Sequence, residues 1–148
     1  MSAINFVPVA KLVQQADERL ADVEGQALEK LVGQLYEERS RKGVGDFPLT
    51  ERIRGYWDSA DTEIDLVALN VPNKRIRFAS CKRNPERLLS DIAVLDGHVQ
   101  RFFATHKRYA SWTAERVSIA PVIPAEIRTK LVAAGHLAQD LADLIVDL

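Results

Sequence analysis

Two pairs of polar residues stand in two predicted strands of the stretch EIDLVALNVPNKRIRFASCKR, residues 63–83. Alternate residues of a strand share one face of the sheet, so Glu63 lies beside Asp65, and Ser80 beside Lys82. An acid placed between the hydrophobic residues of a strand needs a partner, which a metal ion, a cation or water can supply. Two adjacent strands would thus bring an acid and a lysine side by side.

Two interpretations of Asp65 and Lys82 are open at this point. The first is a structural ion pair between neighbouring strands, which spacing alone favours because paired charges are common and catalytic pairs are rare. The second is a catalytic pair, in which the acid is an oxygen ligand for a metal and the lysine stabilises negative charge. The elements around the two residues distinguish these interpretations.

Hydrophobic residues recur at three- and four-residue spacing from residue 9 to residue 39, which predicts one long helix or two consecutive helices. Gly25 lies inside this pattern and suggests either a break or a close packing approach. The sequence RKGVGDFPLT then ends the helix and forms a loop. We expect residues 1–20 to form an N-terminal helical arm and residues 21–148 to form the domain.

Three strands are predicted next, over residues 52–58, 63–71 and 75–82. Pro72 and Asn73 supply turn residues between the second and the third. Consecutive strands joined by such short connections predict an antiparallel meander.

A helix begins after this meander, with Asn84 as its N-cap and Pro85 as its first residue. A strand over residues 115–123, a short helix over 124–135 and a final helix over 136–148 follow. The buried stripe of the long helix is expected at Leu88, Ile92, Leu95, Val99 and Phe102 or Phe103. The predicted fold is therefore α/β, with a mixed sheet of about four strands flanked by helices.

Composition narrows the class of protein. A chain of 148 residues that is 47% hydrophobic is long enough to bury the core of one domain. No apolar run approaches the length of a bilayer span, and the amino terminus lacks the layout of a signal peptide, so we expect a cytoplasmic protein without membrane contact. The single cysteine, Cys81, excludes an intramolecular disulfide and a cysteine-based zinc cluster, and we expect it to be a small apolar strand residue.

Charge is unevenly distributed, although the net charge is only −1. Residues 74–87 contain six Lys and Arg residues and one acid, whereas the last fifteen residues contain three Asp and no Lys or Arg. The middle of the chain is basic and its end is acidic.

Other candidate residues are weaker. The three histidines, His98, His106 and His136, share no short ligand spacing, so we expect them to be solvated or capping residues. Tyr56 and Trp57 could stack on a base, but an aromatic residue in a strand more often belongs to the core or the sheet surface. No GxxxxGK[ST] motif occurs, and we therefore expect no ATP hydrolysis by this chain.

The order of the elements and three motifs, GQALEKLV, GYWDSADTEIDLVAL and FASCKRNPERL, together resemble a known family. The order is similar to that of the restriction-endonuclease-like (PD-(D/E)xK) nuclease superfamily. The motifs resemble the domain of unknown function at the carboxyl end of a group of archaeal and bacterial AAA-type ATPases. The resemblance covers residues 22–123 and implies a restriction-endonuclease-like core.

The resemblance implies a role for individual residues. Glu29 would be the acid of the first core helix, Asp65 the metal-binding aspartate of the second core strand, and Lys82 the lysine of the third. In such nucleases the acids hold Mg²⁺, which polarises the scissile phosphate, and the lysine assists a water or stabilises developing charge. Nucleic acid, DNA rather than RNA, would be the substrate, and an AAA-type ATPase domain a partner.

Two positions depart from the superfamily pattern. Ile64 replaces the proline before the aspartate, which is a frequent variation. Ser80 stands two residues before Lys82, where a second metal-binding acid is expected, and a hydroxyl is a poorer Mg²⁺ ligand than a carboxylate. Glu63 or Glu29 could supply the missing carboxylate.

Two functions therefore remain open. The first is a metal-dependent nuclease that contacts the nucleic-acid backbone through Arg75, Arg77, Arg83 and Arg87. The second is a catalytically inactive module that retains the fold, binds nucleic acid or protein and is associated with an AAA-type ATPase. A carboxylate close to Asp65 in space would favour the enzyme, and a closed or filled cleft would favour the module.

Overall fold

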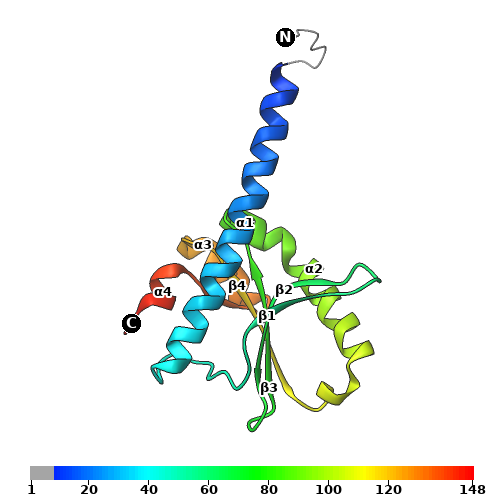
Figure 1. Cartoon of the computed structure of the whole chain (residues 1–148), viewed down its shortest axis with the longest axis vertical. Coiled ribbons are helices and arrows are strands. Elements are labelled where there is room, and N and C mark those ends of the chain that lie inside the picture. The colour runs from blue at the N-terminus through cyan, green and yellow to red at the C-terminus, as the bar shows by residue number, and fades with distance from the viewer. Residues whose placement is uncertain (1–8) are drawn as a thin grey trace.

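A five-stranded sheet with helices on both faces forms the fold (Figure 1). The computed structural model describes residues 9–148, with side chains from residue 25 onward. The predicted α/β class with a mixed, helix-flanked sheet is confirmed, with five strands in place of about four. The elements are α1 (Val9–Arg41), β1 (Arg54–Trp57), β2 (Glu63–Asn70), β3 (Arg75–Cys81), α2 (Pro85–Thr105), a short 3-10 helix (Lys107–Tyr109), β4 (Thr113–Ile119), α3 (Ala125–Ala133), β5 (Leu137–Gln139) and α4 (Leu141–Ile145).

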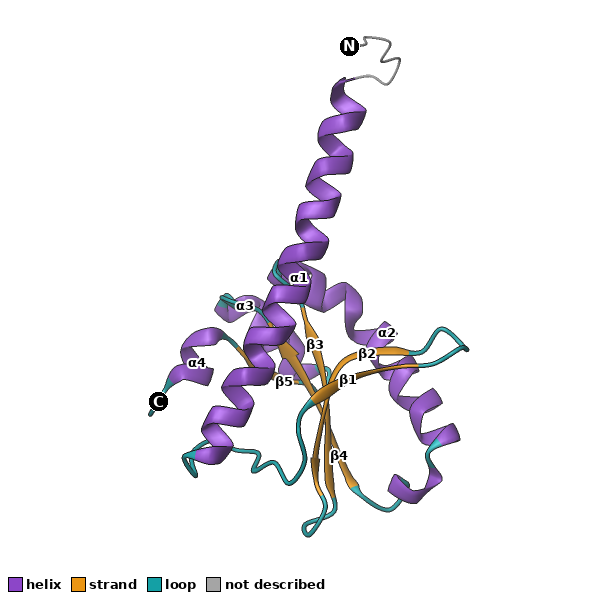
Figure 2. Ribbon diagram, viewed as in Figure 1, coloured by secondary structure: helices purple, strands orange, loops and turns teal. Residues whose placement is uncertain are grey.

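The sheet is mixed because its two halves pair differently. The strands β1, β2 and β3 form the predicted antiparallel meander. β3 then pairs with β4, and β4 with β5, in parallel. Parallel neighbours need a long crossover between them, and α2 provides the one from β3 to β4. The sheet order consequently follows the chain order from β1 to β5 (Figure 2).

α2 begins where the sequence predicts. The Asn84 side chain accepts a hydrogen bond from the backbone N–H of Glu86, and Pro85 occupies the first turn, where its missing N–H costs nothing. The buried residues of α2 are Leu88, Leu95, Val99 and Phe102, whereas Ile92 is half-buried. The predicted stripe is thus largely correct.

The end of the chain differs from the prediction. A single helix over residues 136–148 was expected, but β5 occupies Leu137–Gln139 and only Leu141–Ile145 is helical. β5 is held by parallel pairing with β4, a contact that local periodicity does not report. Asp140 starts α4 by a capping box with Asp143, which fixes the helix start after the strand.

Separate core clusters cover the two faces of the sheet. One packs α1 against the sheet and includes Val32, Leu66 and Val117. Another packs α2 against the opposite face and includes Phe78 and Val99. Each face of the sheet is thus closed by one long helix, and the open space for a site lies at the strand ends between them.

β2 contains a β-bulge near its start, where it pairs with β1. The register between β1 and β2 shifts between Arg54 and Tyr56, and one residue of β1, Gly55, faces two residues of β2, Asp65 and Leu66. Such a bulge bends a strand locally and redirects its side chains. An acid therefore lies at the irregular point of an otherwise regular strand.

The bulge directs Asp65 to the same side of the sheet as Leu66. Ile64 and Val67 both pack in the cluster under α2, although three-residue spacing would place them on opposite faces of a regular strand. Leu66 packs in the cluster under α1. Without the bulge, Asp65 would share a face with Val67 and would be turned away from α1.

α1 is continuous through Gly25, so neither the predicted break nor the predicted close approach occurs there. A Cβ added at Gly25 meets nothing within 4 Å. The helix also runs without interruption across the boundary expected between residues 20 and 21. The first eight residues of the expected arm lie outside the described residues, and the following part of α1 projects beyond the sheet (Figure 1).

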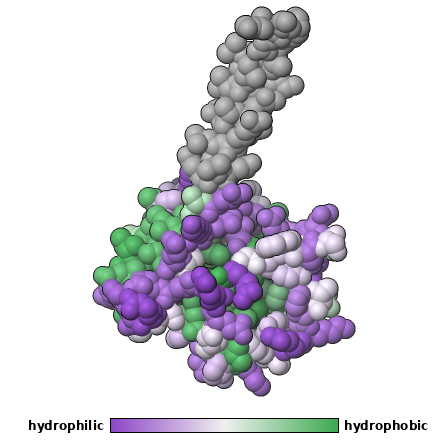
Figure 3. All heavy atoms as spheres, viewed as in Figure 1, coloured by the Kyte–Doolittle hydropathy of each residue, from purple (hydrophilic) through white to green (hydrophobic). Residues whose placement is uncertain are grey.

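Hydrophobic residues also reach the surface. Figure 3 shows them gathered on the flank of the molecule where α3 and α4 lie. Val132 of α3, Ile145 of α4 and Val146 after it are each more than half exposed. None of the helices in the described part of the chain is long and apolar enough to cross a bilayer.

We expect Gly55→Ala to destabilise the protein. The new Cβ would stand 2.9 Å from the carbonyl oxygen of Asp65, a backbone atom that moves only if the bulge moves. The cost should be about 1–3 kcal/mol of the free energy of unfolding, as for other overpacked positions. Chemical denaturation measures it.

Gly25→Ala is the matched control. It adds the same methyl group in open helical space and should stabilise the protein by about 0.5–1 kcal/mol. Equal stability of Gly55→Ala and the wild type would contradict the role assigned to the bulge.

Candidate active site

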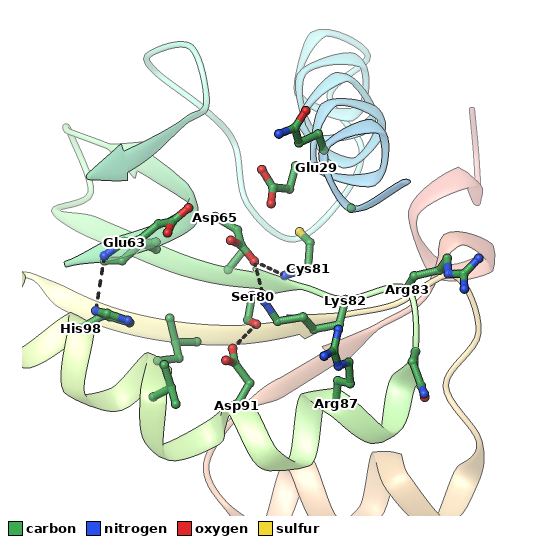
Figure 4. A pocket seen from close by; sticks show the side chains of 17 residues that line it. Glu29, Glu63, Asp65, Ser80, Cys81, Lys82, Arg83, Arg87, Asp91 and His98 are labelled. Atoms are coloured by element: carbon green, nitrogen blue, oxygen red, sulfur yellow. Dashed lines mark hydrogen bonds and ion pairs between the residues drawn. The ribbon is translucent and has the colours of Figure 1, made fainter. Parts of the chain in front are cut away.

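A cleft of about 580 Å³ opens at the ends of β2 and β3, between α1 and the start of α2. Figure 4 shows Glu29 projecting from α1 towards Asp65 on β2, with Lys82 and Ser80 on the other side of Asp65. The polar residues that line it are Gln26, Glu29, Glu63, Asp65, Ser80, Lys82, Arg83, Asn84, Arg87, Asp91 and His98. The three residues predicted to act together, Glu29, Asp65 and Lys82, thus meet in one cleft.

Asp65 is the centre of this cleft. Its Oδ2 accepts a hydrogen bond of 2.8 Å from the backbone N–H of Cys81 and lies 3.7 Å from Lys82 Nζ. The regular β2–β3 pairing ends at Leu66 and Ala79, so the carboxylate satisfies a strand N–H beyond the last paired residues. The Asp65 side chain is 14% exposed, and that of Lys82 is 31% exposed.

Glu29 reaches the same point from α1. Burial is the largest cause that raises its pKa, and the charge of Asp65 and a hydrogen bond shared with it raise it further, to about 7. Lys82 lowers the pKa, and Glu63 raises it slightly more. Glu29 therefore holds its proton more tightly than an ordinary glutamate does, beside the Asp65 carboxylate and a lysine.

Glu63 has a looser place in the cleft. Its side chain is exposed, and its backbone N–H donates to His98 Nδ1 at 3.3 Å. The negative charge of Glu63 contributes to the raised pKa of Glu29. Of the predicted metal ligands, Glu29 and Asp65 make direct contact and Glu63 stands at the rim.

The structure adds one acid that the sequence did not suggest. Ser80, which is buried, donates a hydrogen bond of 2.5 Å from Oγ to Oδ2 of Asp91 on α2. Asp91 also lines the cleft. The position that lacks a strand carboxylate thus has a helix carboxylate bonded to it. The helical spacing that predicts the buried stripe of α2 could have shown that Asp91 neighbours Leu88 and Leu95, but not that it meets Ser80.

The four arginines predicted to bind nucleic acid do not form one surface. Arg83 and Arg87 are exposed and line the cleft. Arg75 and Arg77 do not line it, and both bind Glu115 of β4. Of the four, only Arg83 and Arg87 therefore lie at the cleft, and the predicted contact with nucleic acid stays a prediction.

Arg77 is a buried structural residue. It is 2% exposed, and its guanidinium donates to Asp46 at 2.9 and 3.0 Å, to Glu115 at 2.7 Å and to Tyr36 at 3.1 Å. The Phe47 ring lies 5.0 Å from its guanidinium carbon. These partners compensate the burial of the charge and tie the loop after α1 to the sheet.

Two of the three histidines occupy structural positions, and one of them is buried. His106 closes α2 as its C-cap. His136, expected to be solvated or capping, is 2% exposed, with Nδ1 3.1 Å from Ser118 Oγ and Nε2 3.0 Å from Asp96 Oδ1. Ser118 is itself only 1% exposed. This Ser–His–Asp arrangement lacks access for a substrate and joins β4, α2 and the start of β5.

A model of the DUF234 family, described as archaeal and bacterial proteins of unknown function, matches residues 1–92. The match covers more than half of the 148 residues. The chain belongs to this family. No curated protein and no solved structure matches the chain.

The predicted likeness to an archaeal and bacterial domain of unknown function is thereby confirmed. The DUF234 match includes Glu29, Asp65, Lys82 and both acids at the edges of the cleft, Glu63 and Asp91. These acids and the lysine thus lie within the matched part of the chain, whereas His98, which also lines the cleft, lies beyond it.

The donor set of the DUF234 site can be compared with the needs of Mg²⁺. Within residues 9–148, no group of three or more His, Cys, Asp or Glu side chains is already arranged to hold a metal ion. Glu29 and Asp65 nevertheless offer carboxylate oxygens, and Mg²⁺ commonly uses one or two carboxylates and keeps several waters. Burial is the largest cause that raises the pKa of Glu29, and the charge of Asp65 raises it further, a repulsion that a divalent cation between the two carboxylates would relieve. The residues therefore fit Mg²⁺.

The pH dependence of stability should report the Glu29 pKa. The pKa of about 7 in the folded protein lies above the ordinary 4.5, so the folded state holds this proton more tightly than the unfolded state. The resulting stabilisation is complete below pH 4.5 and is lost as the pH rises through about 7. Glu29→Gln should remove this loss, and denaturation between pH 5 and pH 8.5 measures it.

Glu51→Gln, a change at an exposed glutamate of the loop before β1, is the control and should keep the wild-type pH profile. Mg²⁺ should stabilise the wild type more at pH 8 than at pH 6, because binding requires the ionised carboxylate. A Glu29→Gln profile that still falls between pH 5 and pH 8.5 would contradict the pairing of Glu29 with Asp65.

Proposed function

We propose that this DUF234 protein is a metal-dependent phosphodiester hydrolase of the restriction-endonuclease-like superfamily, acting on nucleic acid, with DNA as the preferred substrate. The observation that carries the proposal is the convergence of Glu29, Asp65 and Lys82 in an open cleft. These residues come from separate parts of the chain. Together they provide the two carboxylates and the one ammonium group that a metal-dependent phosphodiester hydrolase of this type needs.

Glu29 and Asp65 would hold Mg²⁺ in this cleft. The bound metal supplies Lewis-acid activation of the scissile phosphate. Asp65 is well prepared for this role, because the Cys81 N–H fixes one of its oxygens while the carboxylate faces Glu29. Glu29 would have to lose its proton to bind Mg²⁺, so metal binding and proton release would be linked.

Lys82 provides positive charge at the reacting phosphate. Its Nζ stands 3.7 Å from Asp65 Oδ2, close enough to attract the carboxylate and far enough to turn to a phosphate oxygen. An ammonium group held in the cleft stabilises the negative charge that develops during phosphodiester cleavage. A structural ion pair alone would not require the open cleft around it.

Asp91 takes the place of the strand acid that Ser80 replaces. The Ser80 hydroxyl donates to Asp91 and orients its carboxylate at the cleft wall. A carboxylate contributed by α2 can thereby serve the site from the neighbouring element. This arrangement supports the active reading of the site over the reading in which Ser80 abolishes it.

Arg83 and Arg87 would bind the phosphates next to the scissile one. Both are exposed, both line the cleft, and both stand at the amino-terminal end of α2, where the helix dipole also favours anions. Basic side chains that neutralise backbone phosphates bind nucleic acid without sequence preference.

The second candidate is a catalytically inactive module that binds nucleic acid or protein beside an AAA-type ATPase domain. The neutral Ser80 and the lack of a preformed three-ligand group among the described residues favour it. It shares the arginines with the first candidate but needs neither Lys82 nor the acids. Cleavage therefore separates the two.

Cleavage of plasmid DNA and of single-stranded DNA in Mg²⁺ or Mn²⁺ tests the proposed function. We expect the wild type to cut, and Asp65→Ala and Lys82→Ala each to lose at least roughly a hundred-fold in rate, as for other groups that act on transition-state charge. Lys130→Ala, at an exposed lysine of α3, is the control and should cut like the wild type. Metal titration by calorimetry should show binding to the wild type and its loss in Asp65→Ala.

Absence of metal binding and of cleavage in the folded wild type, on DNA and on RNA, would refute the enzyme. Asp65 and Lys82 would then be the structural ion pair of a binding module.

Exchanging the residues of the Ser80–Asp91 pair tests the role of the helix carboxylate. Asp91→Ser alone should weaken metal binding and cleavage, because no acid then remains at this wall. The double change Ser80→Asp with Asp91→Ser returns the acid to β3 and keeps its hydroxyl partner, so it should restore both. A double variant that folds but is no better than Asp91→Ser would show that Asp91 acts only as a partner for Ser80.

A further inference from the structure

Trp57 is the most exposed large hydrophobic residue in the described part of the chain. It ends β1 and is 78% exposed. Its neighbour Tyr56 packs edge-on against Phe102 of α2, with ring centroids 5.0 Å apart. Trp57 makes no ring or cation contact of this kind with the described residues. An indole left in solvent contributes little hydrophobic stabilisation to the fold, and its ring is accessible to a ligand.

Trp57 lies on the face of the sheet that carries the acids. It pairs across the strands with Glu63, so the two side chains point to the same side. Glu63 and Asp65 share that side because Ile64 between them packs under α2. The indole is therefore a neighbour of the acidic cleft and not of the α2 core.

A second groove connects Trp57 to the cleft. It measures about 360 Å³ and runs between α1 and the edge formed by β1 and β2. Glu29, Glu63 and Asp65 line both the groove and the cleft. The remaining polar lining includes Lys30, an exposed residue of α1. One path thus leads from Arg83 and Arg87, past the acids, to Trp57.

We propose that Trp57 is a platform on which an unpaired base of the nucleic acid stacks, so that the substrate is a single strand or an unpaired segment of a strand. The inference rests on the proposed function, since it assigns the substrate of that same site. Phosphates bind at Arg83 and Arg87, the scissile phosphate lies at Asp65 and Lys82, and the base of a nucleotide on the other side reaches Trp57.

An unpaired base is required by the geometry of stacking. A tryptophan ring stacks on the face of a base, and inside a duplex, away from its ends, both faces of each base are covered by neighbouring base pairs. Stacking on single strands tolerates any base, because every base has an aromatic face. Arg83 and Arg87 line the cleft, and Lys30 and the exposed Trp57 line the groove; basic groups together with an aromatic ring are typical of sites that follow a single strand.

Binding of short DNA without divalent metal tests the inference apart from catalysis. The probes are a labelled twelve-nucleotide thymidine strand and a strand of equal length and charge built only of abasic units. Trp57→Ala should weaken binding of the thymidine strand at least roughly five-fold and leave the abasic strand unchanged. Trp57→Phe keeps an aromatic ring and should bind nearly like the wild type.

Val122→Ala is the matched control, since Val122 is 68% exposed but lines neither the cleft nor the groove. It should bind both strands like the wild type. In a Trp112→Phe background Trp57 is the sole tryptophan, and its fluorescence should be quenched by the thymidine strand but not by the abasic strand or by a blunt duplex. A uridine strand shows whether RNA is accepted as well.

The inference is overturned if Trp57→Ala binds the thymidine strand like the wild type, if it weakens both strands equally, or if the duplex quenches as strongly as the single strand. These outcomes are independent of the proposed enzyme. If the wild type cuts DNA and Trp57→Ala binds the thymidine strand as the wild type does, the hydrolase proposal stands and the proposed role of Trp57 is wrong. If the wild type binds the thymidine strand more tightly than the abasic strand but cuts nothing, the hydrolase proposal is wrong and the protein is a module that binds single strands. A folded wild type that neither binds nor cuts would overturn both.

Discussion

One hydrogen bond, from the Cys81 N–H to the Asp65 carboxylate, determines how the two central strands end. The backbone pairing of β2 and β3 stops at Leu66 and Ala79, and an unpaired buried N–H beyond it would cost as much as a lost hydrogen bond. The side chain removes that cost and lets the strands separate. The separation makes room for the cleft, and the same carboxylate then faces α1.

The features around this bond depend on one another. Gly55 accommodates the bulge, the bulge turns Asp65 to α1, and α1 brings Glu29. The parallel β3–β4 pair requires α2 as a crossover, and α2 contributes Asp91 and the arginine side of the cleft. The site is thereby assembled at the ends of β2 and β3, between α1 and the start of α2.

The sequence was sufficient where the signals were local. The meander, the start of α2 at Asn84 and the pairing of Asp65 with Lys82 all follow from residues close together in the chain. Features set by distant contacts were missed. β5 exists only because it pairs with β4, and the burial of Arg77 depends on partners 31 and 38 residues away. The Ser80–Asp91 bond needs the angle at which α2 crosses the strand, which no spacing rule supplies.

The single cysteine, Cys81, lies at the centre of the site with a thiol of low reactivity. Cys81 is 3% exposed, and burial together with the charges of Asp65 and Glu29 holds the pKa of its thiol well above the ordinary value. In the folded protein this buried thiol therefore resists alkylating reagents, which react with the thiolate. It becomes reactive only when the end of β3 opens. The rate at which Cys81 is alkylated therefore measures how often the structure opens locally at the centre of the site. The measurement needs no label elsewhere in the chain.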